Sequence, residues 1–177
     1  MAVKNWTIDT AHSAMEFSVK HMMISTVRGK FEEFGGEITG DADDLSTMQA
    51  KITIKAKSIA TGNQDRDNHL RSDDLFASEK FQDITFVSKK VNVKGEDLEV
   101  VGDLTIRGIT KEVTLKGEYS GKVNDPWGNE RFGLTATTSI NRQDFGVKWN
   151  MVLEGGGLMV GDKVNLSISL EAFAPKE

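Results

Sequence analysis

Apolar and polar residues alternate along most of the chain, which is the pattern of strands that bury one face. In the segment 15–21 every second side chain belongs to one mainly apolar face, made by Met15, Phe17, Val19 and His21. The same period of two recurs later in the chain, in segments 27–34, 37–39, 50–56, 84–93, 98–106, 113–119, 132–140 and 164–170. We therefore expect eight or nine strands.

Turn-forming residues separate these segments. Lys94-Gly95-Glu96-Asp97 and Arg107-Gly108 stand between alternating arms and predict hairpins. Gly35-Gly36 predicts a turn or bulge before Glu37, and the acidic stretch Gly40 to Asp44 predicts a loop. An irregular, glycine-rich segment, 143–161, precedes the last strand.

One stretch departs from the pattern of strands. Residues 63–76, NQDRDNHLRSDDLF, carry closely spaced charges with Leu70, Leu75 and Phe76 among them. Asn63 or Asp65 can cap a helix, so we expect one short helix near residues 63–76. It would cover a barrel opening, its ion pairs fastening it in place.

The predicted fold is all-β: an antiparallel, eight-stranded barrel with one short helix, formed by residues 1–177 as a single domain. So many strands in one sheet leave two unpaired edges, and closure into a barrel removes them. A barrel of eight strands is either filled by its own side chains or wide enough for one small ligand. The interior therefore bears directly on function.

Small residues among the apolar positions favour a cavity. They are Gly29, Ala50, Ala56, Gly102, Gly117 and Ala136. Each leaves volume that larger side chains would fill, and an empty void of methyl size costs about 1 kcal/mol. The alternative is that these residues relieve crowding at tight barrel corners. An apolar tunnel would suit long hydrocarbon chains.

Composition narrows the partners. The net charge of −5 and the scattered lysines argue against nucleic acid. There are no cysteines, and no apolar run is long enough for a membrane-spanning helix, so we expect no stable membrane insertion. The N-terminus shows no signal peptide, which favours a cytoplasmic protein, or a periplasmic or secreted one if a signal has been removed.

Few residues suggest chemistry. Asp9, His12 and Ser13 resemble the parts of a hydrolase triad, but no nucleophile elbow accompanies them. The histidines His12, His21 and His69 lie far apart without the short spacing of metal ligands. We expect no catalytic residue, no metal and no cofactor. Arg66 and Arg142 are expected to pair with Asp67 and Asp144 and fasten loops. The alternative is that charged residues of the helical stretch gather at the barrel mouth around a phosphate or quinone head group: Arg66, Asp67, His69, Arg71 and Asp73.

Blocks of residues along nearly the whole chain resemble the YceI-like proteins, also described as polyisoprenoid-binding proteins. Near the N-terminus these blocks are Trp6-Thr7-Ile8-Asp9 with His12-Ser13, Phe17 to Met22, and Val27 to Phe31. Further along they are Thr61, Arg66-Asp67, His69-Leu70, Ser72 to Phe76, Ile84 to Phe86, Gly102 to Lys111, Trp127-Gly128, Arg142 to Gly146, and Gly161-Asp162.

The resemblance implies a lipocalin-like barrel whose pore holds an isoprenoid lipid, such as a polyprenyl or quinone tail. It also implies a possible homodimer. The expected function is non-enzymatic binding, carriage or storage of that lipid. The alternatives are an enzyme that acts on a small hydrophobic substrate with a histidine as acid or base, and a solid-cored interaction domain.

The expected ligand-binding residues combine the apolar strand faces with the helical stretch. They are Met15, Phe17, Val19, His21, Phe31, Ile52, Ile54, His69, Leu75, Phe76, Phe86, Leu104, Phe132, Leu134, Phe145 and Leu166.

Overall fold

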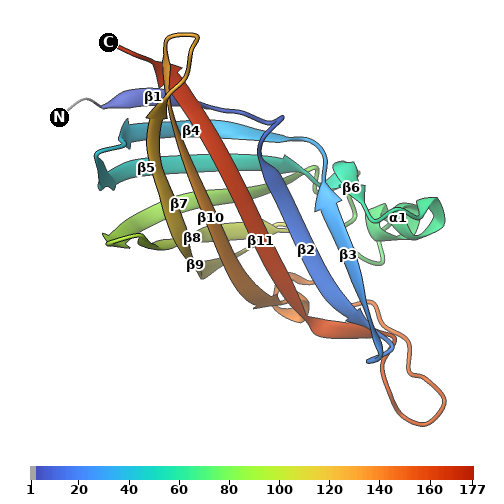
Figure 1. The fold of residues 1–177 in the computed structure, drawn as a ribbon. Helices are drawn as coiled ribbons and strands as arrows, with labels where there is room; N and C mark the ends of the chain where they lie inside the picture. The colour runs from blue at the N-terminus through green and yellow to red at the C-terminus, as the bar shows by residue number, and fades with distance from the viewer. Residues whose placement is uncertain (1–2) are drawn as a thin grey trace.

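The computed structural model describes residues 3–177 as strands with one α-helix between them (Figure 1). The strands are β1 (Lys4–Ile8), β2 (Ala14–His21), β3 (Ser25–Phe31), β4 (Phe34–Asp41), β5 (Asp44–Lys55), β6 (Ile59–Ala60), β7 (Asp83–Lys94), β8 (Asp97–Ile106), β9 (Ile109–Asn124), β10 (Asn129–Asn141) and β11 (Val160–Pro175). The helix is α1 (Gln64–Arg71), and short 3₁₀ turns cover Ala56–Ser58 and Arg142–Phe145.

The strands close into an antiparallel barrel of eight, in the order β1-β4-β5-β7-β8-β9-β10-β11. Pairing of β1 with β11, in which Thr7 lies opposite Phe173, completes the ring. The predicted eight-stranded barrel with one helix is therefore confirmed. Closure leaves no open edge within this ring, which is the physical advantage that the pattern of strands indicated.

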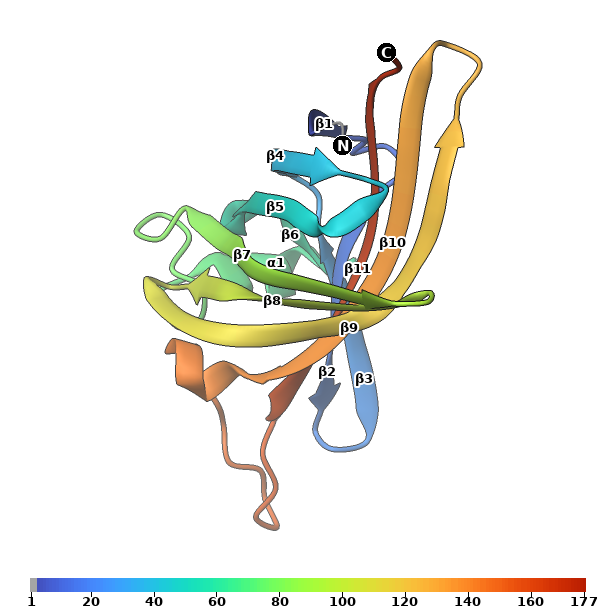
Figure 2. The same cartoon turned by 90° about the vertical axis from the view of Figure 1, so that its left-hand side faces the viewer.

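Three consecutive strands of the ring are interrupted and then resume. The first interrupted strand consists of β1 and β2, which both pair with β11. The second consists of β3, which pairs with β2, and β4, which pairs with β1. The third consists of β5, which pairs with β4, and β6, which pairs with β3. The breaks lie side by side, since the amide of Glu32 donates to the carbonyl of Ser58 and that of Lys55 to Glu33. The segments β2, β3 and β6 lie together at the end of the barrel that is away from the termini (Figures 1 and 2).

The structure corrects two boundaries. Gly35 and Gly36 do not form the turn, because β3 ends at Phe31 and both glycines lie inside β4. At Gly36 a side chain would meet the backbone oxygen of Lys51 on the paired strand, so glycine is needed there for close approach. The expected loop from Gly40 to Asp44 shrinks to Ala42 and Asp43.

The helix begins as the sequence indicates. Asn63 has extended backbone angles, and its side-chain oxygen accepts a hydrogen bond from the amide of Arg66. Asp67 is the buried residue of the helix and accepts from the backbone and hydroxyl of Thr61 at 2.9 and 2.6 Å. These bonds fix the helix to the segment that follows β6.

Candidate functional site

The barrel encloses an apolar cavity of about 600 Å³. Its wall includes every residue that the sequence predicted to bind ligand: Met15, Phe17, Val19, His21, Phe31, Ile52, Ile54, His69, Leu75, Phe76, Phe86, Leu104, Phe132, Leu134, Phe145 and Leu166. Strand pairing explains why these positions meet. In the register of β2 with β11, Phe17 lies opposite Leu166 and Met15 opposite Ile168, so inward parity is shared by neighbouring strands.

The glycines of the wall do not leave the empty space that we inferred from them. A Cβ on Gly29 would lie 2.3 Å from Cζ of Phe17, and one on Gly102 would lie 2.5 Å from Cζ of Phe86. The two phenylalanine rings therefore lie over the glycines and occupy that volume. At Gly117 a Cβ would lie 1.7 Å from the backbone oxygen of Thr135, so this glycine permits a tight barrel corner.

The alanines divide in the same way. Ala50 and Ala136 lie in the cavity wall, where their short side chains leave room. Ala56 instead is buried in a 3₁₀ turn and packs against Leu75 and Ile84. The prediction of a cavity is supported by the structure, although only part of the small-residue argument explains it.

Aromatic packing closes the end of the barrel near the termini. Trp6 lies edge-on to Phe132 with ring centroids 4.9 Å apart, and its indole donates to the carbonyl of Gly40 at 3.0 Å. The hydroxyl of Tyr119 donates to the carbonyl of Ala42. Burial raises the pKa of the Tyr119 phenol. Aromatic rings therefore pack together at this end, and the polar atoms of Trp6 and Tyr119 are hydrogen-bonded.

The opposite end is the mouth, where polar groups join the lining. His21 lies at the end of β2, and Asp65, Arg66 and His69 lie on α1. The ring of His69 meets that of Trp149 edge-on at 4.5 Å, and its Nε2 lies 3.0 Å from the carboxylate of Asp74. Charge is thus available at the rim of the cavity, while the deeper wall is apolar.

The segment between the second 3₁₀ turn and β11 forms one side of the mouth, and Arg142 holds it. Its guanidinium donates to the carbonyls of Val147, Trp149, Val160 and Gly161 at 2.7 to 3.3 Å. Burial lowers the pKa of Arg142, partly offset by Asp162. The nearer carboxylate is thus Asp162, at 3.7 Å, and not the Asp144 that we expected.

Arg66 also has partners other than the expected one. It donates to the hydroxyl and the carbonyl of Thr61, at 2.7 and 2.8 Å. Asp67 accepts from the same threonine. Both residues fasten the helix, as expected, but through Thr61 instead of through each other.

Sequence reasoning missed the part of the wall that lies outside regular strands. Val147, Trp149 and Met159 line the cavity from the glycine-rich segment. Val147 and Trp149 continue a period of two from Phe145, with Gly146 and Lys148 between them. This alternation was the available signal, although the segment does not form a strand.

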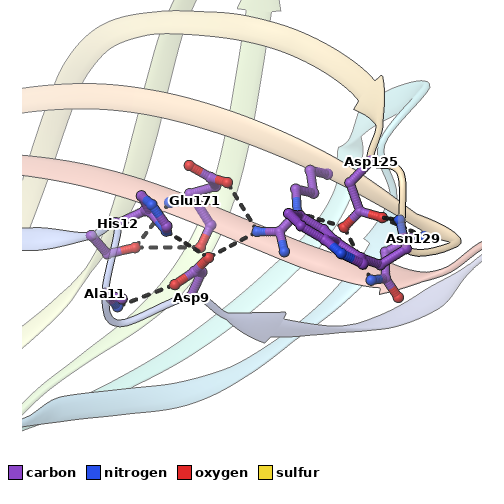
Figure 3. A network of polar contacts seen from close by, with 9 residues as sticks. Asp9, Ala11, His12, Asp125, Asn129 and Glu171 are labelled. Atoms are coloured by element: carbon purple, nitrogen blue, oxygen red, sulfur yellow. Dashed lines mark hydrogen bonds and ion pairs between the residues drawn. The ribbon is translucent and has the colours of Figure 1, made fainter.

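A second cluster of polar side chains, which includes Asp9, Asp125 and Glu171 (Figure 3), does not line the cavity. These three carboxylates surround Arg131. Its guanidinium contacts the carboxylates of Asp9, Asp125 and Glu171 at 2.8 to 3.0 Å. Hydrogen bonds from His12 and then Arg131 hold the pKa of Asp9 below its usual range. At Asp125, burial acts to raise the pKa, but hydrogen bonds from Arg131, Asn129 and Trp127 outweigh it and lower the pKa strongly.

The geometry of this cluster indicates a structural role. In residues 3–177 the group with ligand atoms close enough to share a metal ion is Asp9, His12 and Glu171, within 4.8 Å of one another. The cation there is already Arg131, which contacts both carboxylates. Ser13 exchanges hydrogen bonds with the backbone of Glu171, so Asp9, His12 and Ser13 do not form a triad.

The fold and the cavity together define a class: a closed antiparallel barrel with an apolar pocket inside it. The YceI-like domain family matches residues 6–172, and the chain belongs to this family.

Curated relatives and solved structures support this family membership. A UPF0312 protein of Staphylococcus aureus is 45% identical over 168 residues, which cover 94% of this chain and 96% of that protein. The YceI protein of Campylobacter jejuni has a TM-score of 0.75 at 34% identity, over 89% of this chain and 90% of that one. A domain from Saccharophagus degradans, described as polyisoprenoid-binding, shares the fold with a TM-score of 0.71 at 17% identity, over 96% and 98% of the two chains.

In the part of the chain that the structure describes, no helix is both long enough and apolar enough to cross a bilayer.

Proposed function

We propose that the protein binds a long isoprenoid chain in its barrel, without chemical conversion, and carries or stores it. The observation that carries this proposal is the wall of the cavity. It combines residues such as Leu104, Phe132 and Leu166 from strands all around the barrel, and its volume of about 600 Å³ lies within the range of small-molecule sites.

The deep wall offers a ligand little besides apolar contact. Among the described residues, no buried side-chain nitrogen or oxygen lacks a hydrogen-bond partner. Ser88, a polar residue of the wall, accepts the backbone amide of Ala50. A polar ligand would find no unpaired group there, whereas an alkyl chain gains about 0.8 kcal/mol for each methylene that leaves water.

The family supports the same ligand class, since a domain with this fold is described as polyisoprenoid-binding. The mouth suits the polar end of such a lipid. His21, Arg66 and His69 lie where a head group would remain while the chain enters the cavity. A quinone or a phosphorylated prenyl alcohol both match this arrangement.

The histidines do not form a relay that would favour the enzymatic alternative. In the described part of the chain, His69 is bonded to Asp74 and His12 to Asp9, and neither is bonded to a hydroxyl. Catalysis would need a nucleophile or a positioned acceptor beside one of them.

Mass spectrometry of organic extracts of the purified protein tests the proposal. We expect the extract to contain a prenyl lipid. After incubation of the protein with added polyprenol, we expect the polyprenol to be recovered chemically unchanged. Failure to find any long-chain lipid, together with no binding of added polyprenol, would contradict binding. Recovery of a chemically altered polyprenol would instead support the enzyme.

A further inference from the structure

Large apolar side chains are exposed on two loops beside the mouth. The β2–β3 turn exposes Met22, Met23 and Ile24, and Ile24 is 85% exposed. The loop that precedes β11 exposes Met151, Val152 and Leu158, and Val152 is 72% exposed. We name these six residues the apolar rim.

The two loops form one surface. The amide of Met22 donates to the carbonyl of Met159 at 2.8 Å, which joins the turn to the loop. Within the loop, Met159 donates to Met151 at 2.9 Å, and Val152 bridges to Leu158. Both loops project from the end of the barrel that lies opposite the termini (Figure 1).

The backbone conformation of the β2–β3 turn is unfavourable for the residues that form it. Met22 and Met23 have φ angles of 53° and 64°, in the left-handed region that favours glycine or asparagine. In the three-residue loop between His21 and Ser25, glycine or asparagine would adopt such angles with less strain. Two exposed methionines at these positions are therefore better explained by what their side chains contact than by the turn itself.

The apolar rim is continuous with the mouth of the cavity. Lys20 and His21 line the cavity and directly precede the methionine turn. Met159 and Val160 line it from the other side and directly follow the loop. A surface that covers the apolar rim would therefore face the cavity opening.

The charge of this end differs from that of the whole chain. Segments 19–28 and 147–163 together carry four basic and two acidic residues: Lys20, Arg28, Lys148, Lys163, Glu154 and Asp162. The whole chain has a net charge of −5. One of the two acidic groups, Asp162, lies 3.7 Å from the guanidinium of Arg142. These two segments therefore carry two more basic than acidic residues around exposed apolar tips, as peripheral proteins do toward anionic lipid, while the acidic Asp65 of α1 lies on another side of the mouth.

We propose that the apolar rim docks on the surface of an anionic lipid bilayer and lets the isoprenoid chain pass between bilayer and cavity without crossing water. This inference rests on the proposed function. A bilayer fits better than a second copy of the chain, because the rim consists of two projecting tips. A stable protein interface usually needs a broad complementary patch of about 800 Å² on each partner.

Vesicle flotation tests the docking. The probes are phosphatidylcholine vesicles with and without phosphatidylglycerol, and the variant is Ile24→Ser with Val152→Ser. We expect the wild-type protein to float with anionic vesicles, less with added salt or neutral lipid, and the variant to bind about tenfold less. The matched control is Val123→Ser, at a residue that is 64% exposed on the hairpin at the opposite end, and it should float like the wild type.

Two further measurements separate the possible results. Farnesol binding, followed by the fluorescence of Trp149 in the cavity wall, should be the same in wild type and rim variant. A wild-type protein that binds farnesol but does not float overturns the docking alone, and one that binds no prenyl chain overturns the proposed function as well. If the rim variant floats normally but shifts a dimer to monomer in sedimentation, the rim is an interface between copies and docking is wrong.

Discussion

Phe17 and Phe86 show what the alternation of side chains along a strand predicts and what it does not. Alternation places both rings inside the barrel, and the structure confirms this. Their rings then lie over Gly29 and Gly102 on the paired strands. Alternation alone does not show this, because it depends on the register between paired strands and on the rotamers of the two rings. The inner face was therefore predictable, whereas the use of each glycine was not.

Substitution of Gly117 tests the corner that the backbone makes there. A methyl group in Gly117→Ala would meet the oxygen of Thr135, which belongs to a paired strand and has no rotamer by which to move away. We expect the free energy of unfolding to fall by about 3 kcal/mol, measured by urea denaturation.

Gly35→Ala is the control for that substitution. Gly35 is also a strand glycine, but a Cβ there would meet nothing within 4 Å. Its stability should change by no more than about 0.5 kcal/mol. Equal effects of the two substitutions would contradict the close contact at Gly117.

Ala136 offers a way to fill the cavity from the wall. Ala136→Phe adds a ring to a buried, cavity-lining position, while Thr137→Phe adds the same ring to the exposed face of the same strand. A ring that displaces two methylenes of the ligand should weaken polyprenol binding about tenfold, at about 0.8 kcal/mol for each methylene. Titration of both variants checks this, and equal affinities would place the ligand elsewhere.

At the scale of elements, strands and helix were predictable, and the mouth was less so. The hairpin at Arg107-Gly108 and the cap at Asn63 have local signals, and both are confirmed. In the segment before β11, the alternation of Phe145, Val147 and Trp149 does not make a strand, and the shape depends on the Arg142 guanidinium, which reaches four carbonyls. Tertiary hydrogen bonding of this kind leaves no pattern in the sequence.

Arg142→Met tests whether that guanidinium holds the mouth. Methionine keeps much of the length but donates no hydrogen bond, so four carbonyls lose their partner. We expect a loss of about 3 kcal/mol in the free energy of unfolding and faster proteolysis within residues 147–160. Arg142→Lys keeps the charge but not the planar guanidinium, so its free energy of unfolding should lie between those of the wild type and Arg142→Met. Wild-type protease resistance in Arg142→Met would show that the segment is held by its apolar contacts instead.

At the scale of the whole molecule, barrel closure and the Arg131 cluster coincide. Asp9 follows β1, and Arg131 and Glu171 lie on β10 and β11, so the cluster spans the strands that complete the ring. The sequence shows these charges but not their meeting, since Asp9 and Arg131 are 122 residues apart.

Stability should therefore fall in acid. The pKa values of Asp9, Asp125 and Glu130 are lowered in the folded protein, so their contribution is present above the unfolded value of about 4. It is lost as the pH falls from there through the folded pKa values. We expect the Tm to drop below about pH 4.

Asp125→Asn isolates the largest of these contributions. It should lower the Tm at neutral pH and make its decline in acid shallower, as followed by circular dichroism. Asp97→Asn, at the exposed first residue of β8, serves as the control and should follow the wild-type curve. A wild-type acid profile in Asp125→Asn would show that the cluster does not contribute to acid sensitivity.

The aligned breaks in three neighbouring strands divide the barrel into two parts whose strands are paired to different extents. Above the breaks the ring is continuous, through the pairing of β1 with β11. Below them, β6 joins β3 through only the pairs Lys30 with Ala60 and Phe31 with Ile59. β3 can therefore part from β6 with few lost hydrogen bonds while β2 stays paired with β11, and the amides of β3 should exchange with deuterium sooner than those of β10. The barrel would widen for a bulky ligand while its closed ring stays intact.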